Sequence, residues 1–253
     1  MSFFRLIPWT APILIFGAFE ALIRWPKSIF WVVPLVTLIT FFSIWLLTNR
    51  DFRKLKFWNF LISPLLLVNT SWLFLIFLEG KFIRHAFLLV VVILFWLFLK
   101  VVFLYFHLRP KYQAHTLENV SSYLNLITIF LLFSGFFNLF IFLNVSFWLL
   151  ILIGLIATAL LTYQLFIVSD VSLIASRVYI GVITLIIGEL SLAIKFLPTS
   201  NYVNSLIIAL SYYLITGLSR NWLLDIKEPK VMRRYLTISF ISLIIILVTA
   251  KWI

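Results

Sequence analysis

One carboxyl group, Glu189, lies where the chain offers little water, close to the middle of the apolar stretch 178–197. An ionised carboxylate at the centre of a bilayer costs at least a few kcal/mol, so such a group is normally protonated, paired or functional. Tyr212, Tyr213 and Gln164 are the candidate hydrogen-bond partners of the protonated acid. Two interpretations stay open: a proton, cation or ligand site that includes both tyrosines, or a structural acid that joins helices.

A second group of reactive side chains lies in the connector 107–119. Its candidate site residues are His107, Arg109, Lys111 and His115. Arginine and lysine can hold a phosphate, and imidazole titrates near neutral pH and can act as a base. This pattern is compatible with a lipid-modifying enzyme. The alternative is a basic connector in which Thr116 or Asn119 caps the next helix.

Other catalytic and metal-binding patterns are missing from the sequence. The chain has no cysteine, which excludes disulfides and thiolate ligands. The histidine spacing matches no zinc motif, and there is no glycine-rich phosphate loop, Ser-His-Asp arrangement or His-Glu-x-x-His motif. We therefore predict no metal and no cofactor, and we favour a non-enzymatic function.

The elements that position these residues are predicted by composition. Hydrophobic residues make up 64% of the 253 residues and charged residues 11%, against about 45–50% and 25% in soluble domains. About 20 apolar residues form a membrane-spanning helix. The sequence therefore predicts an all-α, polytopic transmembrane helix bundle of about nine spans in a single integral membrane domain, 1–253. The predicted spans are 8–25, 28–48, 57–78, 82–106, 120–143, 146–168, 178–197, 202–219 and 235–252.

The first of these spans is the weakest. Glu20 interrupts it, and if it lies on the membrane surface, eight spans remain. No small-x-small cleavage site precedes Trp25, so we expect this segment to be retained. Glu20 and Arg24 have the spacing of an ion pair within one helix.

The net charge of +12 comes from lysines and arginines gathered in short connectors. Beside membrane segments such cations set topology and contact lipid headgroups, so we expect membrane lipids and not nucleic acid as partners. The N-terminus and four connectors carry 13 of the 20 cations, which predicts an N-in/C-out orientation. Those connectors are 49–56, 107–119, 169–177 and 220–234. Short loops favour a prokaryotic plasma membrane.

Small and polar residues recur at helical spacing in four spans. In the seventh span Gly181, Thr184, Gly188 and Ser191 step by three, four and three residues, which predicts one close-packing face. The fifth, sixth and eighth spans carry similar sets. They are Ser121, Asn125, Thr128 and Gly135; Gly154, Thr158 and Thr162; and Ser205, Ala209, Tyr212 and Thr216.

Three functions remain open. The first is binding or transport of a hydrophobic or weakly polar ligand, suggested by intramembrane Glu189. The second is a non-enzymatic accessory or structural subunit with a membrane-protein partner, suggested by the polar helix faces. The third is a lipid-modifying membrane enzyme acting at the cytoplasmic interface, suggested by the connector 107–119. We rank them in this order.

Overall fold

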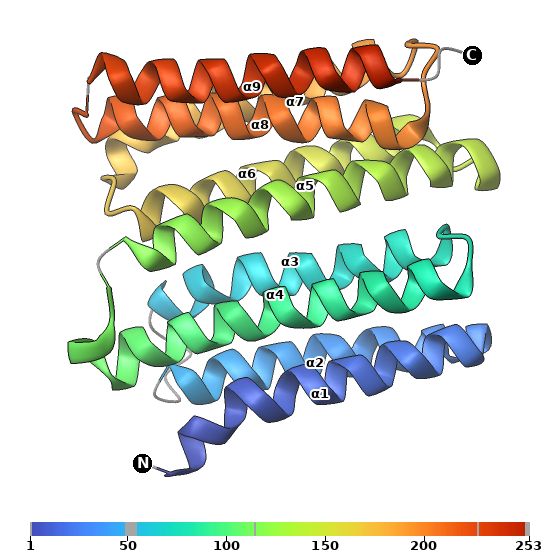
Figure 1. Ribbon diagram of the computed structural model, residues 1–253, viewed down its shortest axis with the longest axis vertical. Helices are drawn as coiled ribbons and strands as arrows, with labels where there is room; N and C mark the ends of the chain where they lie inside the picture. The colour runs from blue at the N-terminus through green and yellow to red at the C-terminus, as the bar shows by residue number, and fades with distance from the viewer. Residues whose placement is uncertain (1, 49–54, 114, 227, 251–253) are drawn as a thin grey trace. The chain divides into compact units, whose positions relative to one another are not determined.

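The computed structural model describes residues 2–48, 55–113, 115–226 and 228–250, and all its regular structure there is helical. Nine of these helices are long and apolar enough to cross a membrane (Figure 1). They are α1 (Ser2–Arg24), α2 (Ile29–Leu47), α3 (Leu55–Ile76), α4 (Lys81–His107), α5 (Thr116–Leu143), α6 (Phe147–Val168), α7 (Leu173–Ile194), α8 (Asn201–Leu223) and α9 (Pro229–Thr249). Two 3₁₀ turns, η1 (Pro26–Ser28) and η2 (Arg109–Lys111), lie between helices. The all-α polytopic prediction is confirmed, whereas the N-in/C-out orientation stays a prediction.

Helix boundaries differ from the predicted spans on both sides of the connector 220–234. α8 continues to Leu223, and α9 begins at Pro229. A proline fits the first turn of a helix because its fixed φ suits the helix and its missing N–H is not needed there. Hydropathy marks the hydrocarbon region only, whereas helices continue into the interface. Most of this predicted connector is therefore helical.

The turn after α8 is a compact reversal. Asp225 has a φ of 58°, the left-handed conformation that ends many helices. The Asp225 amide bonds the Trp222 carbonyl at 3.1 Å, and the Ile226 amide bonds the Asn221 carbonyl at 2.9 Å. This pair of bonds is a Schellman motif. It brings the chain back along α8 within a few residues.

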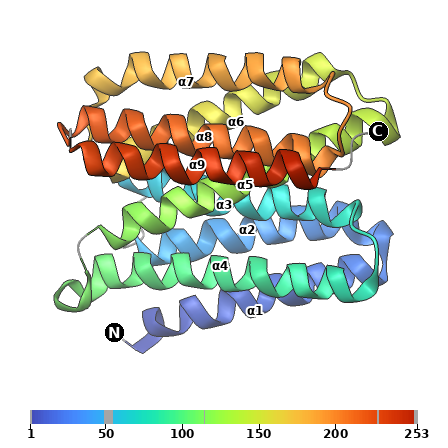
Figure 2. The ribbon, with the colours of Figure 1, turned by 45° about the horizontal axis from the view of Figure 1, so that its top comes forward.

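The chain groups into two compact units, Met1–Leu124 (unit 1) and Asn125–Ile253 (unit 2), with the boundary inside α5. Within unit 1, α1 packs against α2 and α4, and α3 packs against the same two helices. Both views show α1 running beside α4 (Figures 1 and 2). The core of unit 1 is aliphatic and aromatic, with Phe19, Phe57, Phe95 and Phe98 fully buried.

Within unit 2, α6 packs against α7, α7 against α8, and α8 against α9. Amide side chains connect its helices. Asn125 of α5 donates to the Gln164 side chain and to the Leu161 carbonyl of α6, both at 3.0 Å. Asn201 of α8 donates to the Asn138 side chain of α5 at 2.8 Å. Unit 2 therefore buries polar links between helices.

The predicted close-packing face of the seventh span is only partly packed. Gly188 and Ser191 are buried, and a Cβ at position 188 would stand 2.6 Å from Leu155. Gly181 is exposed and has no atom within 4 Å of its Cβ position. Of the two glycines on the predicted face, only Gly188 therefore lies in close contact with α6.

Candidate functional site

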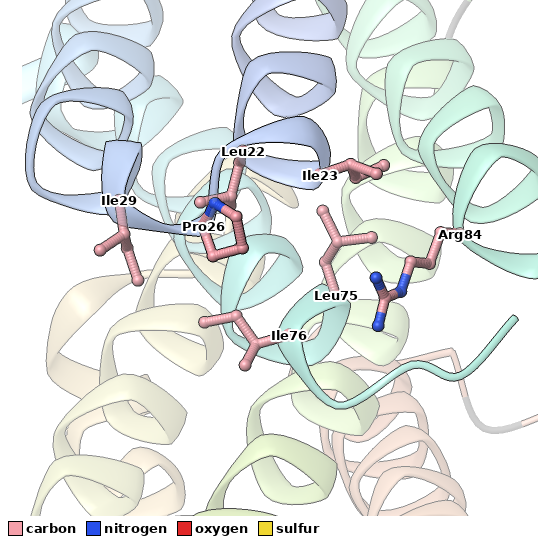
Figure 3. A pocket seen from close by; sticks show the side chains of 7 residues that line it. All are labelled: Leu22, Ile23, Pro26, Ile29, Leu75, Ile76 and Arg84. Carbon is pink, nitrogen blue, oxygen red and sulfur yellow. The ribbon is translucent and has the colours of Figure 1, made fainter. Parts of the chain in front are cut away.

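Unit 1 contains a cavity of about 300 Å³ at one end of its helices (Figure 3). Its lining combines apolar side chains with one cation. The lining residues are Leu22, Ile23, Pro26, Ile29, Leu75, Ile76 and Arg84. They come from the end of α1, the start of α2, the end of α3 and the start of α4. The cavity therefore lies where two consecutive helix pairs reverse direction.

The two reversals have identifiable causes. Pro26 opens the 3₁₀ turn η1, and Trp25 before it is extended, with a φ of −129°. A proline disfavours the helical conformation in the preceding residue. Between α3 and α4, Gly80 has a φ of 82°, which only glycine adopts at no steric cost. These turns end the helices at the cavity.

Arg84 gives the cavity its polar character. Its Nε donates to the Leu78 carbonyl at 2.7 Å, so the side chain satisfies a carbonyl just beyond the end of α3. Figure 3 shows the guanidinium directed toward Leu75. Among the described residues, the guanidinium has no other hydrogen-bond or ion-pair partner. Ile76 is 44% exposed, whereas Leu22 and Leu75 are buried. The cavity can therefore hold an apolar group and offer donors to an anion.

A carboxylate and an imidazole meet beside this cavity. The Glu20 carboxylate of α1 lies 3.4 Å from Nε2 of His85 of α4. The other ring nitrogen of His85 lies 2.8 Å from the Lys81 carbonyl. The predicted pair of Glu20 and Arg24 is wrong: no ion pair joins them among the described residues, and Glu20 lies beside His85 of α4 instead.

Glu189, the principal sequence candidate, lies on an exposed face of α7. The observed helix ends at Ile194, so Glu189 lies five residues, about 7.5 Å, from that end and not at the middle of α7. It forms no hydrogen bond with Tyr212, Tyr213 or Gln164. A ligand or proton role for Glu189 stays a prediction. A ligand or protein that bonds this carboxylate would contact the exposed face of α7.

Tyr212 and Tyr213 diverge because consecutive helix residues point about 100° apart. Tyr212 is 1% exposed. Thr162 and Asn125 are next to its hydroxyl, although no hydrogen bond of good geometry forms there among the described residues. Tyr213 instead packs on Tyr235 of α9, with ring centroids 5.3 Å apart. The two tyrosines thus face different helices.

His107 is the last residue of α4 and lies between two phenylalanines. Its ring stacks on Phe103 with a centroid distance of 5.3 Å, and Phe4 lies 4.8 Å away. Both ring nitrogens are buried and have no hydrogen-bond partner among the described residues. The residue as a whole is half-buried, so its ring packs on apolar side chains at the end of α4.

The remaining connector candidates are separate from His107. His115 is exposed, has a φ of 62°, and bonds the Glu118 carboxylate at 2.9 Å. Lys111 is exposed at the end of η2. The backbone of Arg109 belongs to η2, but its side chain lies outside the described part of the structure. No described contact joins His107 and His115, and a shared site that includes Arg109 and Lys111 stays a prediction.

Helix α5 begins directly after this connector. It starts at Thr116, so Asn119 lies inside the helix and not at its cap. His115, with its left-handed backbone, immediately precedes the first helical residue. The sequence identified this helix start to within a few residues but not the residue that precedes it.

Neither Arg84 nor His85 was among the candidates selected from the sequence. The cavity brings together residues between positions 22 and 84, and no local sequence pattern predicts that these residues lie close together. The available signal was the recurrence of cations and turn residues at both helix reversals, Lys27 after Pro26 and Arg84 after Gly80.

Comparisons with known proteins define no relative: no family model, no curated protein and no solved structure matches this chain. The fold itself defines the class, a polytopic membrane helix bundle.

Proposed function

We propose that this membrane protein binds an amphiphile with an apolar body and a small anionic or polar head in the cavity of unit 1. The observation that carries the proposal is the single guanidinium, that of Arg84, on an otherwise apolar lining. Ligand sites are typically apolar cavities in which a few polar groups set orientation. A volume of about 300 Å³ suits part of an acyl chain or a small terpenoid and not a large polar solute.

The position of the cavity supports an amphiphile. The lining residues lie at helix ends, which is the depth of the headgroup region for helices of membrane length. An anionic head can then meet Arg84 while the chain stays among Leu22, Ile29 and Leu75. Guanidinium forms strong, charge-assisted bonds with carboxylate and phosphate oxygens.

The proposal is tested by photocrosslinking in lipid nanodiscs with a diazirine-bearing C16 fatty acid. Labelled peptides should include the ends of α1 and α3. Arg84→Gln should reduce saturable labelling about tenfold, equivalent to about 1.4 kcal/mol. Ile76→Trp, which fills the entrance from an exposed position, should reduce it similarly.

Lys81→Gln is the matched control, because Lys81 is an exposed cation one turn from Arg84 and does not line the cavity. Its labelling should stay within twofold of the wild type. Equal losses in Lys81→Gln and Arg84→Gln would show general charge attraction and refute the cavity as the site. Unchanged labelling in Ile76→Trp would also refute it.

A second function, an accessory subunit of a membrane complex, is supported by Glu189. Contact between an exposed carboxylate and lipid costs free energy, and a polar partner on a second protein would lower that cost. The partner protein would supply a hydrogen-bond donor to α7. Native mass spectrometry after gentle extraction should then show a stoichiometric protein that Glu189→Gln weakens. A lone chain in both samples would count against this function.

The lipid-modifying enzyme remains the third hypothesis. It receives no support from the separated positions of His107 and His115. Replacing both histidines by glutamine should abolish turnover if the hypothesis is correct.

A further inference from the structure

An arginine is buried at the end of α8. Arg220 lies four residues before Leu224, the residue that caps the helix, and is only 9% exposed. Arginine remains charged under all physiological conditions. Removing an ion from water costs several kcal/mol unless opposite charge or hydrogen bonds compensate. The buried guanidinium therefore needs compensating partners.

Its protein partners compensate only part of that cost. Nη2 donates to the Tyr235 hydroxyl at 3.1 Å. Nη1 is buried and has no hydrogen-bond partner among the described residues. None of the described carboxylates forms an ion pair with Arg220. A neutral phenol cannot balance the charge, so the guanidinium keeps both a positive charge and an unused donor. The C-terminal end of a helix dipole favours a cation but supplies only about half a unit charge.

The position of the guanidinium is fixed by packing. Tyr235 of α9 packs against Tyr213 and presses on Gly217, where a Cβ would overlap the tyrosine ring. Tyr213, Gly217 and Arg220 are spaced four and three residues apart, so they share one face of α8. Glycine at 217 thus allows the ring to lie flat enough for its hydroxyl to reach Arg220. The side chain is held inside unit 2 and does not extend into water.

A second unused donor follows directly in the sequence. Asn221 is 5% exposed, and its Nδ2 is buried with no described partner. Its backbone carbonyl already accepts from the Ile226 amide, so the turn fixes this residue. Arg220 and Asn221 together present donors without an acceptor. The start of α9 adds exposed Lys230, Arg233 and Arg234.

We propose that Arg220, with Asn221 and Tyr235, binds a phosphate oxyanion. Guanidinium matches phosphate oxygens through two parallel N–H···O bonds, and the Tyr235 hydroxyl can donate its own proton while it accepts from Nη2. Both a phospholipid headgroup and free phosphate carry this chemistry. The site lies on the face predicted to be cytoplasmic. Trp222, 54% exposed, and Ile226, 41% exposed, flank it with apolar surface that suits an acyl chain.

The test compares binding of dioleoyl phosphatidylglycerol and of inorganic phosphate by the full chain. Native mass spectrometry of detergent-solubilised protein with added lipid gives a dissociation constant for the tightest lipid. Arg220→Gln should weaken that lipid at least tenfold. Tyr235→Phe, which keeps the ring and removes only the hydroxyl, should weaken it twofold to fivefold. Dioleoylglycerol, which lacks the phosphate, should show no dependence on Arg220.

Arg233→Gln is the matched control, because it removes one exposed cation from the same face. It should change the constant by less than twofold. Arg220→Lys keeps the charge without the two-bond geometry and should bind with intermediate affinity, which provides a second variant if Arg220→Gln does not fold. Folding is checked by size-exclusion chromatography and circular dichroism.

The two phosphate sources are separated by titrating inorganic phosphate into lipid-depleted protein. Binding that depends on Arg220 for phosphate but not for the lipid would identify free phosphate as the ligand and support the site. Equal losses of affinity in Arg220→Gln and Arg233→Gln would show that only the overall positive charge matters. That result would overturn the proposal. Wild-type binding of both probes by the Arg220 variants would overturn it too. A co-purifying protein that depends on Arg220 when neither probe binds would also overturn it.

Discussion

The two units associate their helices by different means. In both units the hydroxyl groups mostly bond carbonyls of their own helix, as Thr40 does with Val36 in unit 1 and Thr216 with Tyr212 in unit 2. In unit 1 the largest fully buried side chains are aliphatic and aromatic, and one described side-chain bond, from Thr37 to Asn69, joins two helices. In unit 2 the buried amides of Asn125 and Asn201 bond neighbouring helices. Lipid is as apolar as leucine, so helices associate through packing and through polar links, and each unit emphasises one of these.

This difference also separates the two proposed sites. The unit 1 cavity is apolar with one cation at its edge, whereas Arg220 of unit 2 is buried with unused donors. In unit 1 the site is a space between helix ends. In unit 2 it is a set of buried hydrogen-bond donors, on Arg220 and Asn221, that have no described acceptor.

The largest effect on stability should come from a cavity in unit 1. Phe95→Ala empties a fully buried position of α4, and a change of this kind costs about 3–5 kcal/mol because burial is lost and a cavity remains. The free energy of unfolding is measured by SDS titration of protein in dodecyl maltoside micelles. Leu97→Ala, at a 38% exposed position of the same helix, is the control and should cost well under half as much. Similar losses would show that unit 1 does not depend on close packing.

An intermediate effect should follow loss of an amide link in unit 2. Asn125→Ala removes two hydrogen bonds to α6, which at about 0.6–1.7 kcal/mol per interhelical link in membranes costs about 1–2 kcal/mol. Asn69→Ala is the matched variant in unit 1, where Asn69 accepts one bond from Thr37 of α2 at 3.2 Å. Its cost should be about 0.5 kcal/mol in the same titration. A larger cost at Asn69 than at Asn125 would reverse the contrast between the units.

The smallest effect concerns the two glycines of α7. Gly188→Ala should destabilise by about 1 kcal/mol, because the new methyl group meets Leu155 while alanine improves helix propensity. Gly181→Ala has open space and should stabilise by up to about 1 kcal/mol. Thermal unfolding in nanodiscs compares the two. Equal and stabilising changes would mean that α7 and α6 are not closely packed at Gly188.

Much of the fold was predictable from sequence. Hydropathy identified nine helices because each crossing needs a continuous apolar stretch, which is a local property. Boundaries failed at 220–234, where α8 and α9 extend beyond the apolar residues that marked them. The stripe of small residues in α7 was predicted, but the exposed position of Gly181 was not, because the pattern states which residues share a face and not how far that face is covered.

The sequence by itself determined the class of protein, the helical content and the places where cations gather. Only the tertiary structure decided that Arg84 lines a cavity together with Leu22, and that Tyr235 bonds Arg220 across fifteen residues of chain. It also decided that Glu189 is exposed whereas Tyr212 is buried. The physical reason is helix rotation. When almost every face of a helix is apolar, composition fixes its depth in the membrane, and the packing of neighbouring helices fixes which side chains meet.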